Sequence, residues 1–341
     1  MNNFSDSSPP RPENRLAYLG IDVGGTAIKF GMCHHDGSVI SSTSVPTEAL
    51  LEPEAVIKCG MQFAQSTLGE SSDKSSKLAG IGLAVPGVLD TAHWCLREVV
   101  NLPHWTDRPL LKILENETQL PSAVINDANA AALAEHQHRG LQHESLALIT
   151  LGTGIGCGLA IGGKGISGDH GCAGEIGHLT VDFNENSAPC NCGKNGHLEA
   201  YAGAPAVIKR ALSAIEDDDG DSFPLGLLDI NLDPRRLAEA ADQGYAGPRK
   251  VIIETATYLG KAIGILGQVI DPAVVLLGGA MTFGGKTKPI GKDFLEAVKK
   301  SVTETTLQQI GSQITIEYSS LGNTAGIIGA AIAARQKGRE Q

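Results

Sequence analysis

The chain has 341 residues, more than a single domain usually contains, so two lobes are expected. Lysine and arginine total 27 against 38 aspartates and glutamates, and this net charge of −11 argues against nucleic acid as a partner, because phosphates require a positive surface. The seven cysteines, mostly isolated among apolar residues, favour a reducing cytoplasm over a disulfide framework.

The first fifteen residues, MNNFSDSSPPRPENR, are polar and contain three prolines. They have no apolar core, so they are not a secretory signal, and we expect a disordered tail. The best candidate for a membrane span, YLGKAIGILGQVI, is interrupted by Lys261. We therefore expect a soluble cytoplasmic protein with no membrane partner.

Leu16 to Val23 is expected to be a buried strand, followed by a glycine turn and a second strand at Phe30 to Cys33. The turn lies within Asp22-Val-Gly-Gly-Thr-Ala-Ile-Lys29. Paired glycines let backbone N–H groups approach a ligand, and a nearby lysine and threonine suit a phosphate. Taken alone, the stretch is better explained as an ordinary Gly-Gly hairpin.

The same arrangement returns at Ala147 to Ala160, ALITLGTGIGCGLA. Two equivalent phosphate hairpins predict an internally duplicated fold that clamps a nucleotide between lobes, as in the actin-like kinases. Neither copy has the Walker spacing, and Gly152 to Gly158 lacks the last glycine of a dinucleotide fingerprint. A dinucleotide site is therefore not expected.

Between the hairpins we expect a helix at Ala49 to Leu68, strands at Leu78 to Val85 and Ser122 to Ile125, and a helix at Ala128 to His138. Asp127 follows the second of these strands. Ligands bind beyond the carboxyl ends of strands in α/β sheets, so Asp127 is a candidate catalytic carboxylate. An aspartate before a helix is also a favoured N-cap, and spacing alone favours the cap.

The stretch Gly171 to Gly203 contains GCAGEIGHLTVDFNENSAPCNCGKNGHLEAYAG. Its glycines let a short loop fold back, so that Cys190, Cys192 and His197 meet one ion, and His178 completes a tetrahedron. A redox pair or two buried thiols are the alternatives, but a closed Cys/His set favours structural zinc.

Two carboxylates accompany these ligands. Glu175 and His178 are three positions apart and can share a face of a helical turn, and Glu199 follows the last ligand. A zinc-bound imidazole keeps its second nitrogen for a hydrogen bond, so the loop would be a zinc-braced cradle for a polyhydroxyl ligand. Solvated surface carboxylates explain the positions equally well.

Residues 216–233 are expected to form an exposed acidic connector without a site. Asp233 and Pro234 are expected to begin a helix that ends near Gly244. After it come a longer helix at Arg249 to Ile270, a strand at Val274 to Leu277, and a closing helix at Asn323 to Ala334 that packs back on the first lobe.

Several of these blocks resemble the ROK family of bacterial sugar kinases and sugar-responsive repressors. Glu175 to Glu199 is similar to the signature Glu-x-Gly-His followed by Cys-x-Cys-Gly-x-x-Gly-Cys-x-Glu, with His197 at the third cysteine. Asn101-Leu-Pro-His-Trp105 resembles Asn-Leu-Pro-Gly-Trp, with His104 at the glycine. The segment NDANAAALAE resembles the block that holds the catalytic aspartate. The resemblance covers nearly the whole chain after residue 15.

The resemblance implies a two-lobed α/β fold of the actin-like (ribonuclease H-like) ATPase type, with a central cleft and a zinc-binding loop at 178–197. The disordered tail would be residues 1–15. The smaller first lobe would take residues 16–126 plus 325–341, and the larger second lobe residues 127–324. The implied reaction is ATP-dependent phosphorylation of a hexose hydroxyl with Mg²⁺, most often O6 of glucose, while fructose, mannose or an N-acetylhexosamine remain open as substrates.

The resemblance also implies roles for single residues. Asp127 would be the general base. The sugar would be bound by Asn101, Asn126, Asp127, Glu175, His178 and Glu199. Phosphates or magnesium would meet Asp22, Gly24, Gly25, Thr26, Lys29, Thr153 and Gly154, and adenosine would lie against Gly278 and Gly279. Structural Zn²⁺ would be held by His178, Cys190, Cys192 and His197, and we expect a homo-oligomer, a dimer or tetramer.

A sugar-sensing transcriptional regulator is the competing class, because it shares this fold and zinc loop. Such a protein needs a DNA-binding module, and fifteen polar residues cannot form a helix-turn-helix. A sugar-binding protein without catalysis is the third possibility, which only an assay separates from a kinase.

Overall fold

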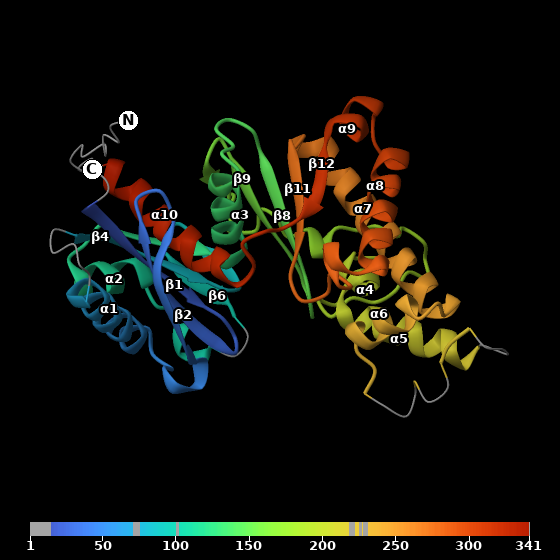
Figure 1. The fold of residues 1–341 in the computed structure, drawn as a ribbon, viewed down its shortest axis with the longest axis horizontal. Coiled ribbons are helices and arrows are strands. Elements are labelled where there is room, and N and C mark those ends of the chain that lie inside the picture. Colours follow the sequence, from blue (N-terminus) through green and yellow to red (C-terminus); the bar gives the residue numbers. More distant parts are fainter. Residues whose placement is uncertain are drawn as a thin grey trace, which may run out of the picture. The chain divides into compact units, whose positions relative to one another are not determined.

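The computed structural model describes residues 15–70, 76–99, 102–217, 222–224, 227 and 231–340 (Figure 1). The chain divides into two compact units. Unit 1 comprises Met1–Gly140, Ser167–Cys172 and Asn323–Gln341, and unit 2 comprises Leu141–Ile166 and Ala173–Gly322. The predicted disordered tail lies outside the described residues up to residue 14.

Unit 1 contains a five-stranded mixed sheet and a two-stranded hairpin. Its strands are β1 (Leu16–Val23), β2 (Ala27–His34), β3 (Val39–Pro46), β4 (Lys77–Val85), β5 (Val88–Asp90), β6 (Cys95–Glu98) and β7 (Ser122–Asn126). Its helices are α1 (Pro53–Glu70), α2 (Leu110–Thr118), α3 (Asp127–His138) and α10 (Ala325–Glu340). The sheet order is β3-β2-β1-β4-β7, with β1, β4 and β7 parallel and β1, β2 and β3 antiparallel. Strands β5 and β6 form a separate hairpin.

The two faces of strand β1 carry different kinds of residue. Leu19 and Ile21 are fully buried in an apolar cluster that includes residues of α1 and α2. Gly20 points to the opposite face, because side chains alternate along a strand. A Cβ at Gly20 would lie 1.9 Å from the carbonyl oxygen of Ile327 in α10. Helix α10 therefore packs directly on the backbone of the sheet.

The closing helix α10 packs on the first unit, as predicted, and helix α3 belongs there too. A Cβ at Gly82 of β4 would lie 1.8 Å from the carbonyl oxygen of Ala330, and one at Gly329 would lie 1.8 Å from that of Ala130 in α3. The sequence placed the border of the first lobe at residue 126. The contacts instead group α3 with unit 1, because α10 and α3 meet through glycine and alanine backbone.

Unit 2 repeats the sheet of unit 1. Its strands are β8 (Leu146–Leu151), β9 (Ile155–Ile161), β10 (Lys164–Gly165), β11 (Val274–Gly278) and β12 (Thr315–Tyr318). Its helices are α4 (Glu199–Ala202), α5 (Ala204–Glu216), α6 (Pro234–Asp242), α7 (Ala246–Ile270), α8 (Pro289–Thr305) and α9 (Gln308–Gln313). The order β10-β9-β8-β11-β12 has the same pattern of antiparallel and parallel pairs as unit 1. The predicted internal duplication is thereby confirmed.

Apolar residues on helix α7 and the sheet form the core of unit 2. The helix follows Gly244, and the helix before it begins as predicted, with Asp233 as N-cap and Pro234 in its first turn. No described helix combines the length with the apolar character that a bilayer crossing requires.

Candidate functional site

The turn between β1 and β2 presents its backbone to solvent. Gly25 and Thr26 are exposed. The Gly24 N–H donates to the carbonyl oxygen of Ala27 at 3.1 Å, and the Thr47 hydroxyl donates to the carbonyl oxygen of Gly24 at 2.6 Å. These two hydrogen bonds fix the conformation of the turn. Its exposed tip is a place where a phosphate could meet backbone N–H groups.

Two charged residues lie beside this turn. The Lys29 ammonium donates to the Asp22 carboxylate at 3.1 Å, and both side chains are partly buried. A Cβ at Gly326, in the first turn of α10, would lie 2.5 Å from an Asp22 carboxylate oxygen. Carboxylate oxygens are ligands that Mg²⁺ accepts, and a lysine can neutralise a phosphate.

The matching turn of unit 2, between β8 and β9, exposes Thr153 and Gly154. The Ile155 N–H donates to Oε2 of Glu199 at 3.0 Å, and a Cβ at Gly154 would lie 2.7 Å from that oxygen. Glu199 is therefore tied to the turn and is not a freely solvated surface charge. The turn is also joined to α5, because the Ala204 N–H donates to the carbonyl oxygen of Gly152 at 2.9 Å.

Glu175 precedes a 3-10 turn, Ile176–His178, which ends at His178, and both side chains are exposed. The turn packs on β9 through glycine: a Cβ at Gly177 would lie 2.5 Å from the carbonyl oxygen of Ile155 and 3.4 Å from Oε2 of Glu199. The predicted group of Glu175, His178 and Glu199 is thus assembled within one unit around the β8–β9 turn.

A pocket of about 610 Å³ opens beside Thr153 in unit 2. Its wall includes Ile208, Lys209, Leu212, Leu232 and Asp233. Aliphatic side chains together with a lysine and an aspartate in the lining suit a flat ring that carries polar edges. Gly279 also lies close to this turn, since a Cβ there would be 2.3 Å from the carbonyl oxygen of Leu151, the last residue of β8.

Asp127 is the first residue of α3 and is half-buried at the carboxyl end of β7. The N-cap of α3 is Asn126, whose Oδ1 accepts the N–H groups of Ala128 at 3.0 Å and Asn129 at 3.1 Å. Asp127 accepts from Ala128 as well, at 2.8 Å. The cap that spacing alone placed at Asp127 is therefore Asn126, because the strand extends to Asn126 and the helix begins directly after it.

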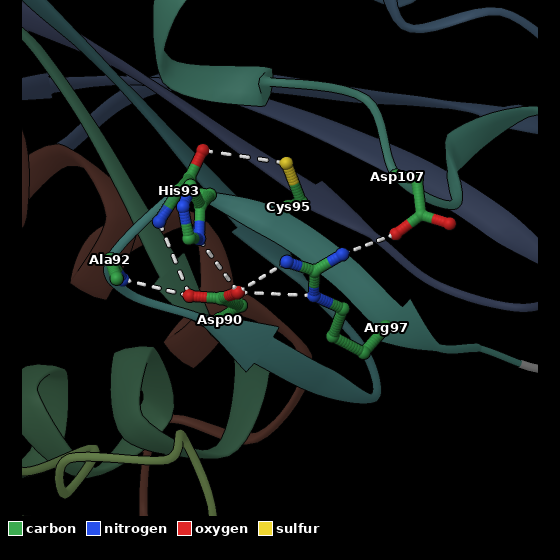
Figure 2. Close-up of polar contacts among 6 residues, drawn as sticks. All are labelled: Asp90, Ala92, His93, Cys95, Arg97 and Asp107. Carbon is green, nitrogen blue, oxygen red and sulfur yellow. Dashed lines mark hydrogen bonds and ion pairs between the residues drawn. The ribbon is translucent and has the colours of Figure 1, made fainter.

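The β5–β6 hairpin precedes the segment that resembles Asn-Leu-Pro-Gly-Trp. Figure 2 shows Arg97 between two carboxylates: it donates to Asp90 at 2.6 Å and to Asp107 at 2.6 Å. Hydrogen bonds from Arg97 and His93 hold the pKa of Asp90 below its usual range. The cluster joins the hairpin to residues beyond the segment. The predicted sugar ligand Asn101 lies outside the described residues.

The other side of this segment is fastened to the beginning of α1. The Trp105 indole is buried and donates to the carbonyl oxygen of Leu51 at 2.9 Å. His104, which stands where the family pattern has glycine, pairs with Glu52 at 3.0 Å. The exposed histidine is therefore compatible with this fold and adds an ion pair at the surface when protonated.

The four predicted metal ligands converge. Donor atoms of His178, Cys190, Cys192 and His197 all lie within 4.8 Å of one another. Sγ of Cys192 is 3.2 Å from Nδ1 of His197, and Sγ of Cys190 is 3.8 Å from Nδ1 of His178. Tetrahedral zinc needs such atoms about 3.5 Å apart, so two thiolates and two imidazoles fit this ion with small movements.

Tyr201 stabilises the loop that carries the predicted metal ligands. Its hydroxyl donates to Asp182 at 2.6 Å and accepts the Ala188 N–H at 2.8 Å. The Tyr201 ring stacks on Tyr258 at a centroid distance of 4.2 Å. Burial, with the Asp182 hydrogen bond second, raises the pKa of Tyr201 to about 12. The hydroxyl thus keeps its proton as a donor and fixes both ends of the segment 182–188.

Sequence reasoning missed two parts of this arrangement. It assigned no site to residues 216–233, yet Leu232 and Asp233 line the pocket, together with α5. The signal was Gly203-Ala-Pro205, a helix start directly after α4, which places α5 beside the β8–β9 turn. It also missed the β5–β6 hairpin, whose residues carry no regular apolar alternation.

Comparison with curated proteins finds relatives along nearly the whole chain. The glucokinase of Halalkalibacterium halodurans is 35% identical over 315 residues, which are 92% of this chain and 93% of that protein. The N-acetylmannosamine kinase of Escherichia coli is 27% identical and covers 94% of this chain. The xylose repressor of Caldicellulosiruptor bescii is 26% identical over 91% of this chain and 76% of its own length.

Solved structures similar to this chain also cover nearly its whole length. The ROK hexokinase from Thermus thermophilus is 31% identical, covers 95% of this chain and has a TM-score of 0.78. The ROK family glucokinase from Streptomyces griseus, solved in complex with glucose and AMPPNP, is 28% identical over 94% of this chain, with a TM-score of 0.69. The ROK family profile matches residues 18–337. With a match of this length, the chain belongs to the ROK family.

Proposed function

We propose that this protein is an ATP-dependent sugar kinase that transfers the γ-phosphoryl group of ATP to O6 of glucose. The observation that carries the proposal is the likeness to one glucokinase at 35% identity over 92% of the chain, together with a half-buried aspartate at the carboxyl end of β7. We place the reaction in the cytoplasm, where ATP is the common phosphoryl donor.

Asp127 is the general base of the proposed reaction. A sugar hydroxyl is a poor nucleophile, so a positioned carboxylate accepts its proton as the oxygen attacks the γ-phosphorus. Asn126 performs the capping of α3, which supports a chemical task for Asp127. Asn101, Asn126, Glu175, His178 and Glu199 are assigned to the sugar hydroxyls, and an analogue that lacks one hydroxyl would leave such a group unpaired.

The two glycine turns are assigned to the phosphates of ATP. Thr26 in unit 1 and Thr153 in unit 2 lie at exposed turns whose backbones are fixed by hydrogen bonds, and Lys29 follows the first turn in β2. The pocket lined by Ile208 and Leu212 is assigned to the adenine ring, with Gly278 and Gly279 close to the same turn. Asp22 would hold Mg²⁺, which when bound supplies positive charge against the phosphates.

Zinc has a structural role in this proposal. His178, Cys190, Cys192 and His197 would hold it, and the ion would supply a rigid crosslink for the loop between Leu179 and Leu198. Each imidazole coordinates through one nitrogen and keeps the other for a hydrogen bond. We assign the second nitrogen of His178 to a sugar hydroxyl, which makes this residue both a metal ligand and a sugar ligand.

The choice of sugar is tested by a coupled assay of ADP release over a panel of glucose, mannose, fructose, N-acetylglucosamine and N-acetylmannosamine. Glucose is expected to give the highest kcat/KM. The panel includes N-acetylmannosamine because a relative of similar length is a kinase for that sugar. A higher kcat/KM with another member would replace glucose and keep the kinase. No turnover with any sugar would favour a sugar-sensing regulator or a binding protein.

The base is tested by Asp127→Asn. An amide cannot accept the hydroxyl proton, so kcat is expected to fall by about 10²- to 10⁴-fold. Because Asn126 caps α3, the variant should melt close to the wild type and still bind sugar. Retention of most of the kcat would show that the base is elsewhere, and Glu175 would be the next residue to change.

A further inference from the structure

The side chain of Asn126 joins three pieces of backbone. Its Oδ1 accepts the N–H groups of Ala128 at 3.0 Å and Asn129 at 3.1 Å, and its Nδ2 donates to the carbonyl oxygen of Gly87 at 3.2 Å. A side-chain amide has two acceptor lone pairs and two N–H donors. The backbone therefore uses three of its four hydrogen-bonding positions, and one N–H remains for a ligand.

Gly87 is a fixed acceptor. It links β4 to β5 with a φ of 80°, a conformation that glycine adopts readily. The hairpin that follows is held on one side by Arg97, which bridges Asp90 and Asp107 (Figure 2). On the other side, a Cβ at Gly171 would lie 2.1 Å from the carbonyl oxygen of Leu89, so the loop 167–172 packs against the hairpin.

These contacts have a consequence for Asp127, the next residue along the chain. Its carboxylate accepts the N–H of Ala128 at 2.8 Å, the same N–H that Asn126 accepts at 3.0 Å, so the direction of the carboxylate depends on the backbone of the first turn of α3. The N-cap bonds set the beginning of that turn, and the Gly87 bond ties the cap to the hairpin. A catalytic group displaced by about 1 Å can lose two orders of magnitude in rate.

We propose that Asn126 is a positioning residue for Asp127, because its amide fastens the first turn of α3 to the β5–β6 hairpin and so fixes the direction of the carboxylate. The proposal rests on the function assigned to Asp127 above. It adds to the sugar contact assigned to Asn126, which would use the remaining N–H. The experiment must therefore distinguish the positioning of Asp127 from two simpler roles of Asn126, a sugar contact alone and a helix cap alone.

Three substitutions at Asn126 divide its contacts. Asn126→Ser keeps a good N-cap, but its shorter side chain cannot reach the carbonyl oxygen of Gly87. Asn126→Asp also keeps the cap, but it places a carboxylate oxygen opposite the carbonyl oxygen of Gly87, and neither can donate a hydrogen bond. Asn126→Ala loses both contacts. We expect kcat to fall by about 3- to 10-fold in the Ser variant and at least as far in the Asp variant, while both melt close to the wild type. The Ala variant should also melt about 2 °C lower.

A substitution at Gly87 tests the same hydrogen bond independently. Gly87→Ala strains a backbone at positive φ and turns the carbonyl oxygen, without altering Asn126 itself. If both residues act through one hydrogen bond, their effects on kcat should not add. The double variant Gly87→Ala with Asn126→Ser should then have nearly the same kcat as the single variant with the lower kcat. The KM for ATP should stay within about twofold in every variant.

Asp242→Ala is the matched control. Asp242 accepts the N–H of Ile290 at 2.8 Å at the beginning of α8, so its loss removes a comparable contact away from α3. It should lower the melting temperature and leave kcat unchanged. The proposal is overturned if the Ser and Asp variants keep the wild-type kcat and change only the KM for sugar, or if kcat follows melting temperature in all variants. If the wild-type protein itself has no kinase activity, that result would instead contradict the proposed function.

Discussion

At the scale of single residues, Asn126 and Asp127 show what spacing can and cannot tell. Both are good N-caps, so a sequence pattern identifies the beginning of a helix but not which of two neighbours caps it. The structure decides by the length of β7, which runs through Asn126 and pairs it with Val85. The place of Asp127 between a strand and a helix was thus predictable, and the assignment of the N-cap to Asn126 was not.

The Cys/His loop was predicted more fully, because its ligand types restrict what it can do. The four donor atoms converge as predicted, although His197 replaces the usual cysteine. The ion itself stays a prediction. The support from Tyr201 and Asp182 could not be foreseen, because a tyrosine four positions beyond His197 carries no sign of its partner nineteen positions earlier.

Purified protein is expected to contain about one zinc per chain, measured by elemental analysis. Cys192→Ser should weaken zinc binding at least about tenfold in a chelator competition, because an alcohol is a poor replacement for a thiolate. His197→Cys should keep the metal, and its Co²⁺ form should gain thiolate-to-metal absorption. Cys172→Ser changes an exposed cysteine outside the loop and serves as the control. Zinc-free wild type, or equal loss in the Cys172 variant, would contradict the assignment.

At the scale of elements, burial decided which strands could be predicted. Strand β1 was predicted with its observed ends, because Leu16 to Val23 is an apolar run buried on both faces. Strand β3 was not predicted, because VISSTSVP lies exposed at the edge of the sheet. Helix α1 begins at Pro53 and not at Ala49, since residues 47–49 form a 3-10 turn and proline suits the first helical turn.

The close packing of α10 on the sheet gives a test by substitution. Gly82→Ala places a Cβ 1.8 Å from the Ala330 carbonyl oxygen, which is backbone and cannot rotate away. The free energy of unfolding should fall by about 1 to 3 kcal/mol, as measured by urea denaturation. Gly69→Ala is the control, because its Cβ would meet no atom within 4 Å and alanine favours a helix. Similar stability of the two variants would contradict the packing of α10 described above.

At the scale of the whole molecule, the duplication was visible as two glycine turns and is seen in the structure as two sheets with one strand order. The border between the units was harder to predict, because unit 1 takes three separate stretches of the chain. Only contacts such as Gly329 against Ala130 reveal that α3 belongs with α10. The predicted homo-oligomer stays a prediction.

Two perturbations should affect the two units separately in hydrogen exchange measured by mass spectrometry. Removal of zinc by a chelator should speed amide exchange in residues 178–203, because the loop loses its crosslink. Gly82→Ala should speed exchange in β1, β4 and α10, which share one packed layer. Wild-type protein kept in excess zinc is the control. Faster exchange spread evenly over the chain in either case would show that the units unfold together.

The return of the chain to unit 1 through α10 sets an order for folding during synthesis. Strands β1 and β4 leave the ribosome early, but the helix that packs on Gly20 and Gly82 is not available until residues 325–340 are made. At ordinary elongation rates, that delay after α3 lasts roughly 10 to 40 s. Residues 173–322 of unit 2 are all made before α10, so the unit whose strands are translated first is the unit that completes its packing last.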